Sequence, residues 1–179
     1  RYERTTTGAT DGLWEYDVAE GRIWCSDQLK RMLGLTTRPD DAAGIDAGSF
    51  SLLIHPDDRQ IEAAAMREHL SQGTPYNVKY RAKSASGEYR WFNSRGQATQ
   101  KDDGSGLLMS GSLADINAAH TAQTRLDLAT RAARIGLWDW DLETDSIIFN
   151  DTYGTMLGYD PGELNGHLDT WKQIVHPED

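Results

Sequence analysis

The chain is organised around the stretch Gly12–Asp17, GLWEYD, because a close copy of it, GLWDWD, returns at Gly136–Asp141. Both copies continue without a gap to the same Met-Leu-Gly triplet, at 32–34 and at 156–158. The spacing between the copies is that of a small domain and is far longer than the unit of a solenoid. The repeat therefore predicts two domains of one kind in tandem.

A second motif is repeated in the two copies: His55–Asp58 reads HPDD, and His176–Asp179 reads HPED. The first copy runs on for a further half-domain beyond this motif, and the second copy has no counterpart within these 179 residues. Two strands alone are marginal in water. We therefore expect residues 128–179 to be the N-terminal half of a second domain. We expect its other half to follow residue 179; the alternative is that a partner molecule supplies it.

Composition limits the class of protein and its partners. Hydrophobic residues make up 38% and charged residues 26%, as in globular proteins. The net charge of −10 disfavours nucleic acid and anionic lipid, and no apolar run is long enough to cross a bilayer. The single cysteine, Cys25, excludes an internal disulfide and fits a reducing compartment, so we expect a cytoplasmic segment without direct membrane contact. No phosphate loop, nucleophile elbow or paired-histidine motif predicts an enzyme.

Alternation of apolar and polar residues predicts five strands, as in Tyr76–Lys83, where every second residue is apolar or aromatic. Helices are expected at 27–33, after the capping residue Ser26, and at 59–72. The polar segment 35–49 is expected to be a loop with room for one short helical turn. This grouping predicts an α+β domain with an antiparallel sheet. The expected strands are 13–18, 22–25, 76–83, 88–100 and 107–114.

Residues 115–134 connect the two copies and contain neither Gly nor Pro, which favours a helix. A heptad frame gives this helix a thin seam with mostly small or polar residues. Such a seam would pair weakly with a second copy of the chain, or the helix would pack on its own domain; the sequence leaves both open. The seam residues are Ile116, Ala119, Gln123, Leu126, Thr130 and Ala133.

Taken together, the ordered motifs resemble the PAS domain, and more narrowly the bacterial subclass with a strongly marked, PAC-type C-terminal half. The resemblance covers almost all of the first copy, so we assign residues 1–117 to a complete PAS domain and 115–134 to a connecting helix. It implies a five-stranded antiparallel sheet, helices on one face, a small cavity, and pairing of the first strand with the last. The motifs are GLWxxD, MLG, HPDD, Tyr80-Arg81, Gly87–Trp91 and Asp115-Ile116.

The resemblance also implies a role in signalling. Such domains sense a small ligand or mediate contacts, and pass a conformational change through a flanking helix to an output domain. We therefore expect a homodimeric sensor whose output, a histidine kinase, a diguanylate cyclase or a chemoreceptor, lies beyond residue 179. Asp115, Ile116 and Leu126 are the candidate relay residues. The alternatives are a ligand-free scaffold for dimerisation or protein–protein contact, and a haem-based gas sensor that binds the iron through His69.

Six residues are candidates for the wall of the cavity. Aromatic rings suit a flat cofactor such as haem or flavin, and they are equally ordinary core material. The sequence requires no cofactor, so its identity stays open. The candidates are Trp14, Tyr16, Phe50, His69, Tyr80 and Trp91.

Three further patterns each suggest a specific binding or reactive role, and each also has a plain structural explanation. His69 falls where some PAS domains ligate haem iron, but a partly exposed histidine near a helix C-terminus is also stabilised by the helix dipole. Cys25 lacks the Asn-Cys-Arg context of the photoactive flavin subclass, which indicates a small buried side chain instead. His55 with Asp57 and Asp58 could bind a metal ion, but we interpret the motif as a helix start capped by an aspartate.

Overall fold

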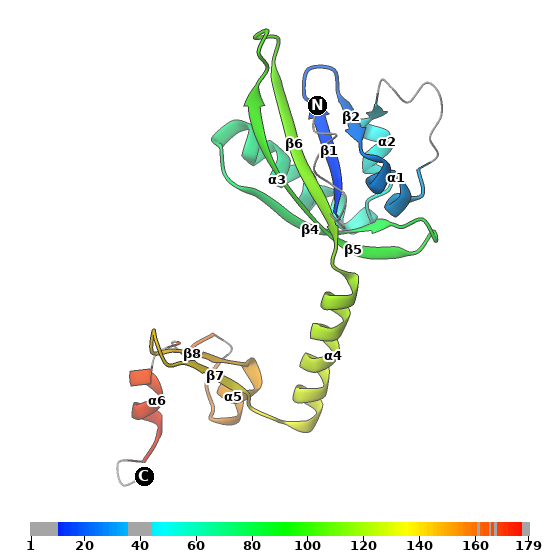
Figure 1. The fold of residues 1–179 in the computed structure, drawn as a ribbon. Coiled ribbons are helices and arrows are strands. Elements are labelled where there is room, and N and C mark those ends of the chain that lie inside the picture. The colour runs from blue at the N-terminus through cyan, green and yellow to red at the C-terminus, as the bar shows by residue number, and fades with distance from the viewer. Residues whose placement is uncertain (1–10, 36–43, 161, 165, 167, 177–179) are drawn as a thin grey trace. The chain divides into compact units, whose positions relative to one another are not determined.

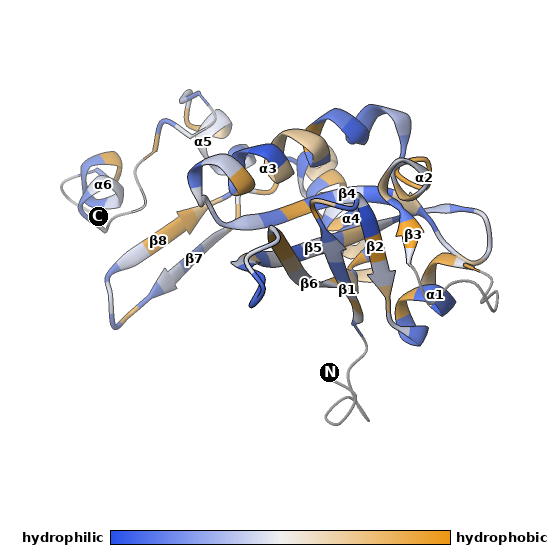
Figure 2. Ribbon diagram, turned by 90° about the horizontal axis from the view of Figure 1, so that it is seen from above, coloured by the Kyte–Doolittle hydropathy of each residue, from blue (hydrophilic) through white to orange (hydrophobic). Residues whose placement is uncertain are grey.

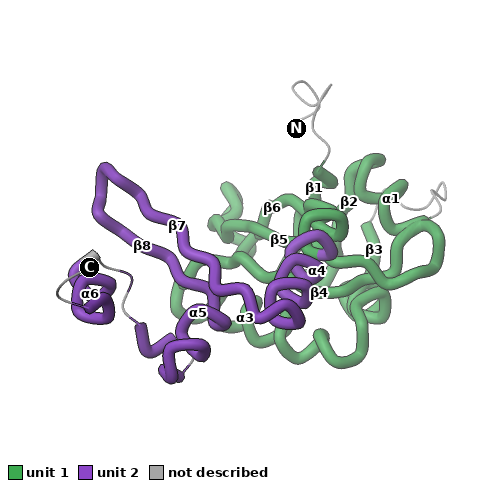
Figure 3. Tube along the Cα trace, turned by 90° about the horizontal axis from the view of Figure 1, so that it is seen from below, with its two compact units in different colours: residues 1–120 green, residues 121–179 purple. Residues whose placement is uncertain are grey.

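The computed structural model describes residues 11–35, 44–160, 162–164, 166 and 168–176. These residues form two compact units, 1–120 and 121–179 (Figures 1 and 3). Most of the loop expected at 35–49 and the Pro177–Asp179 part of the second HPED motif lie outside the described residues. No described helix is both long and apolar enough to cross a membrane.

A single antiparallel sheet forms the framework of the first unit, with the strand order β3-β2-β1-β6-β5-β4 (Figure 1). The expected pairing of the first strand with the last is confirmed, because Trp14 of β1 lies opposite Gly111 of β6. All five expected strands are present. Their bounds are β1 Gly12–Asp17, β2 Arg22–Cys25, β4 Tyr76–Lys83, β5 Tyr89–Gln100 and β6 Leu107–Asp115.

The expectation of five strands was one short, because a sixth, β3 (Ile45–Asp46), pairs with β2. Ile45 lies opposite Ile23, and the Arg22 guanidinium donates to the Gly44 carbonyl at 2.6 Å. Two residues are too few to show an alternating pattern, so this strand could not be predicted from the sequence.

Helices close one face of the sheet (Figure 2). Both expected helices are confirmed: α1 (Asp27–Leu33) begins with the Ser26 hydroxyl accepting the Leu29 N–H, and α3 (Arg59–Gln72) ends at Gly73. Between them lie α2 (Ala47–Ser51) and a 3₁₀ turn, Pro56–Asp58. Alternate side chains of β4 join the core that these helices cover, as the sequence pattern predicts. The buried ones are Tyr76, Val78, Tyr80 and Ala82.

The second unit contains most of α4 (Asn117–Ala133), which confirms the expected connecting helix. It continues with a hairpin, a short helix and a further helix. The bounds are β7 Trp138–Asp141, β8 Ser146–Phe149, α5 Asp151–Met156 and α6 Leu168–Ile174.

The two sequence copies share a backbone-capping arrangement. In the first copy the Ser26 hydroxyl accepts the N–H groups of Leu13 and Leu29, at 2.9 and 3.3 Å. In the second, the amide oxygen of Asn150 accepts the corresponding N–H groups of Leu137 and Tyr153, both at 2.9 Å. In each copy one side chain thus joins the first turn of the helix to the backbone at the start of the first strand or, in the second copy, just before it.

The repeated glycine also has a structural cause. A Cβ on Gly12 would lie 2.6 Å from the Leu29 side chain, and a Cβ on Gly136 would lie 2.9 Å from the Tyr153 ring. Real Cβ atoms do not come this close to neighbouring atoms. The start of β1 and the residues just before β7 (Trp138–Asp141) therefore approach the helix of their own copy at a distance that only glycine permits.

Candidate functional site

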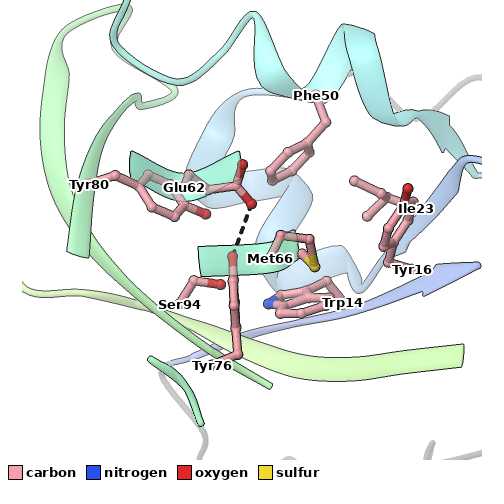
Figure 4. A pocket seen from close by; sticks show the side chains of 9 residues that line it. All are labelled: Trp14, Tyr16, Ile23, Phe50, Glu62, Met66, Tyr76, Tyr80 and Ser94. Atoms are coloured by element: carbon pink, nitrogen blue, oxygen red, sulfur yellow. Dashed lines mark hydrogen bonds between the residues drawn. The ribbon is translucent and has the colours of Figure 1, made fainter. Parts of the chain in front are cut away.

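A cavity of about 30 Å³ lies between the sheet and the helices that cover it (Figure 4). Four of the six residues predicted for its wall do line it: Trp14, Tyr16, Phe50 and Tyr80. We call it the Trp14–Glu62 cavity. Its full lining is Trp14, Tyr16, Ile23, Phe50, Glu62, Met66, Tyr76, Tyr80 and Ser94.

The indole of Trp14 lies flat on the sheet because two glycines leave room for it. Gly96 of β5 and Gly111 of β6 face each other across the strands, and Trp14 is opposite Gly111. A Cβ on Gly96 or Gly111 would come within 2.7 or 2.4 Å of the indole ring. Trp14 is 6% exposed, and its N–H has no hydrogen-bond acceptor among the described residues.

A polar cluster closes the inner end of the cavity. The Tyr76 hydroxyl donates to Glu62 Oε1 at 3.0 Å, as the dashed line in Figure 4 marks. Burial raises the pKa of the Glu62 carboxyl, and the hydrogen bond from Tyr76 opposes that shift. Burial likewise raises the pKa values of the Tyr76 and Tyr80 phenols, which both lie within hydrogen-bonding reach of Ser94. Both phenols are therefore neutral donors at physiological pH.

The outer end of the cavity is apolar and reaches the surface. Tyr16, Ile23, Phe50 and Met66 are each partly exposed, and so is Glu62, whereas Tyr76, Tyr80 and Ser94 are buried. The cavity thus joins an apolar mouth to a polar inner wall, which is the arrangement that orients an amphipathic small molecule.

Sequence reasoning missed Ile23, Glu62, Met66, Tyr76 and Ser94. The alternation of β4 could have found Tyr76, because it shares the buried face of Tyr80. Glu62 gave no such signal, since a glutamate in the first turn of a helix is ordinarily a solvated residue that favours the helix dipole.

His69 does not line the cavity, and both of its ring nitrogens have backbone partners. Nδ1 donates to the Thr74 carbonyl, and Nε2 accepts the Ala98 N–H at 3.0 Å. The side chain is 3% exposed, so the interpretation of a partly exposed histidine was wrong. Iron ligation needs a free ring nitrogen, and a cavity of about 30 Å³ is far smaller than the several hundred that a cofactor of haem or flavin size occupies. The residues present do not fit haem.

Trp91 also lies away from the cavity, because it does not face the core. Its ring stacks on His120 of α4, with centroids 4.3 Å apart and planes at 16°. The Arg81 guanidinium lies 5.6 Å from the centroid of the same ring. Trp91 therefore contacts the start of the connecting helix rather than a ligand.

The HPDD motif forms a helix start, although not through the aspartates expected to cap it. His55 Nδ1 accepts the Asp57 N–H at 3.3 Å and so caps the 3₁₀ turn. Asp58 makes no capping bond; it accepts from Arg81 Nη2 at 2.7 Å, Nε at 2.9 Å and the backbone N–H at 2.8 Å. Among the described residues no group of histidine, cysteine and acidic side chains could hold a metal ion.

Cys25 lies at the end of β2 with 2% exposure, as the sequence interpretation expects. Burial raises the pKa of its thiol to about 11, so the group is an unreactive thiol at physiological pH.

The candidate relay residues lie where β6 passes into α4. Asp115 pairs with Arg90 at 3.0 Å, and Ile116 donates its N–H to the Trp91 carbonyl at 3.0 Å. The amide oxygen of Asn117, the first residue of α4, accepts the Trp91 N–H at 3.2 Å. The start of α4 is therefore attached to β5 as well as to β6. Leu126 lies further along the helix and is 50% exposed.

Comparison with known proteins finds two relatives of note, one of which is named as a light-activated histidine kinase. A Pseudomonas chlororaphis protein without an assigned role is 30% identical over 154 residues, covering 78% of this chain and 58% of that protein. A blue-light-activated histidine kinase of Brucella anthropi is 28% identical over 123 residues, covering 69% of this chain and 24% of the kinase. The chain thus spans little more than half of one curated relative and about a quarter of the other.

A solved structure shares the architecture. The sensory box histidine kinase/response regulator from Burkholderia thailandensis superposes with a TM-score of 0.57 at 31% identity, covering 71% of this chain and 92% of that one. The family model described as the PAS fold matches residues 22–113, just over half of the chain. That match runs from β2 through almost all of β6 and includes most of the residues that line the cavity. The chain therefore belongs to the PAS-fold family, a family of sensory modules rather than catalysts.

Proposed function

We propose that this chain is the sensory input part of a larger bacterial signalling protein, with occupancy of the Trp14–Glu62 cavity as its signal. One observation carries the proposal: the Trp14 indole, the floor of the cavity, lies against Gly111 of β6, the strand that leads directly into α4. A guest that moves the indole displaces the strand that positions the connecting helix. The connecting helix would then exist in two arrangements, and their relative populations would depend on whether the cavity is occupied.

The output that we propose is a histidine kinase. The Brucella and Burkholderia relatives are both named as histidine kinases, and that supports this class over a cyclase or a chemoreceptor. We further propose that the second copy begins another PAS domain. The capping shared by Ser26 and Asn150 and the close approaches of Gly12 and Gly136 support a tandem arrangement, with a PAC-type half formed by 76–115 in the first domain.

The relay through α4 is tested by breaking the helix. Leu126→Pro removes a backbone donor and clashes with the preceding turn. Leu126→Ala keeps the helix and is the matched control. In the full-length parent protein, autophosphorylation should lose its dependence on signal in Leu126→Pro and keep it in Leu126→Ala. Unchanged regulation in Leu126→Pro would refute the relay.

A dimerisation scaffold is the second candidate, and the exposure of Leu126 on the heptad seam favours it. A homodimer that pairs along α4 would cover that side chain. Sedimentation of the protein over a range of concentrations distinguishes the dimerisation scaffold from the sensory module. A strict monomer at the highest concentration would exclude the scaffold and leave the sensory proposal in place.

A further inference from the structure

Glu62 is a partly exposed residue of the cavity wall, and it has no cationic partner among the described residues. Its one hydrogen bond comes from a neutral phenol, Tyr76. No lysine or arginine of the described residues forms an ion pair with it or contributes to its pKa. A desolvated carboxylate without a counter-charge is costly, and proteins ordinarily supply a cation or leave the group protonated.

Aromatic residues line the cavity around this carboxyl group. Figure 4 shows the hydroxyl ends of Tyr76 and Tyr80 next to Glu62, and the rings of Phe50 and Trp14 further along the cavity. The faces of such rings carry partial negative charge and attract cations, most strongly where water is excluded. The net charge of −10 on the chain adds a field that favours cations over anions. The carboxyl group, the aromatic faces and the net charge of the chain all favour a positively charged guest.

The size of the cavity limits what can bind. About 30 Å³ accommodates a group of very few heavy atoms, not a flat cofactor. The partly exposed mouth, formed by Phe50, Met66 and their neighbours, gives a thin apolar stem a path to the surface. Met66 is an unbranched, adaptable side chain that can move to admit one.

We infer that the Trp14–Glu62 cavity binds the ammonium group of a small primary amine, with the cation donating to Glu62 and enclosed by the rings of Trp14, Phe50, Tyr76 and Tyr80. This inference rests on the proposed sensory function and specifies the chemical class of its ligand. The carboxylate supplies the counter-charge, and the aromatic faces replace part of the water that the ammonium group loses.

The test uses n-propylamine, which is a cation at pH 7, against 1-propanol, a neutral molecule of the same length. The indole N–H resonance of Trp14 in a ¹⁵N spectrum reports binding, because that group lies in the cavity wall. Propylammonium should shift the resonance at concentrations at which propanol does not. A propanol shift equal to that of the amine overturns the ammonium inference and leaves the sensory function standing.

The variants are Glu62→Gln and Glu68→Gln, a matched pair on the same helix. Glu68 is exposed and does not line the cavity. Loss of a charge-assisted hydrogen bond should weaken propylammonium binding about tenfold or more in Glu62→Gln, and Glu68→Gln should bind as the parent chain does. Equal binding by Glu62→Gln, or no amine binding by the parent chain, overturns the inference. The sensory function is judged separately, by the Leu126→Pro output.

If Glu62→Gln failed to fold, Glu62→Asp would serve in its place. The aspartate keeps the negative charge, but its side chain is shorter by one methylene group, so the carboxylate lies further from the bound cation. Binding of propylammonium should therefore weaken, while the preference for propylammonium over propanol should remain. A thermal melt of each variant establishes that it is folded. An Asp variant without preference for the amine would count against the inference as directly as the Gln variant would.

Discussion

At the scale of single residues, three hydrogen bonds join Asp58 to Arg81. The carboxylate accepts two guanidinium hydrogen bonds and one from the backbone, so it fixes the start of α3 against β4. The hydrogen bonds from Arg81 hold the pKa of the Asp58 carboxyl below its usual range. The stabilisation is therefore present above about pH 4 and is lost as the pH falls through the lowered pKa.

Asp58→Asn should lower the free energy of unfolding by about 2 kcal/mol at pH 7, because charge-assisted bonds are replaced by weaker ones. Urea unfolding at pH 7 and pH 3 measures this, and the variant should lose less stability on acidification than the parent chain. Asp57→Asn is the control, since Asp57 is 72% exposed and 3.5 Å from Arg81. A loss as large for Asp57→Asn would contradict this account.

The close contact between the Trp14 indole and Gly111 gives a second prediction at the scale of single residues. Gly111→Ala places a Cβ 2.2 Å from the Arg95 carbonyl oxygen and 2.4 Å from the indole. Overpacking against backbone should cost about 1–3 kcal/mol in thermal or urea unfolding and should shift the Trp14 fluorescence. Gly154→Ala, whose Cβ would meet its nearest neighbour at 3.7 Å, should not destabilise. An undisturbed indole signal in Gly111→Ala would refute the close approach.

At the scale of elements, the capping side chain at the start of α1 joins a strand to a helix, and the second copy does the same with asparagine. Ser26→Ala leaves the N–H groups of Leu13 and Leu29 without this acceptor. The free energy of unfolding should fall by about 1 kcal/mol. Ser26→Asn should retain most of the parent chain's free energy of unfolding, because the Asn150 side chain accepts the equivalent N–H groups in the second copy. Equal losses in the two variants would contradict the shared arrangement.

Across the whole molecule, the two units differ in how much apolar surface they bury. Among the described residues beyond 120, Ile147 is the one buried large apolar side chain, whereas the first unit has a continuous core. The second unit leaves several large apolar side chains exposed. They include Trp138, Trp140, Leu142, Ile148 and Met156.

Hydrogen exchange followed by mass spectrometry should therefore separate the units. Amides of β7 and β8 should exchange much faster than those of β5 and β6, because a two-stranded hairpin opens locally at little cost. Comparable protection of the two hairpins would show that the second unit is stabilised by contacts that its own burial does not provide.

The sequence by itself determined the repeat, the strands with a clear alternation and the capped helices. These features follow from contacts between residues that lie near each other in the chain, and their periods can be read directly. The resemblance supplied the pairing of the first and last strands, which no local pattern could provide. The two-residue strand β3 was missed because it exists only through its pairing with Arg22 and Ile23.

Only the tertiary structure decided the composition of the site. His69 and Trp91 were plausible wall residues on type and position, but the hydrogen bonds of His69 and the stacking of Trp91 place both elsewhere. A glutamate in the first turn of a helix is ordinarily solvated, whereas the packing of α3 places the Glu62 carboxyl group beside the Tyr76 hydroxyl of β4. A cavity is made by side chains distant in the chain, so its lining depends on packing, which local sequence does not encode.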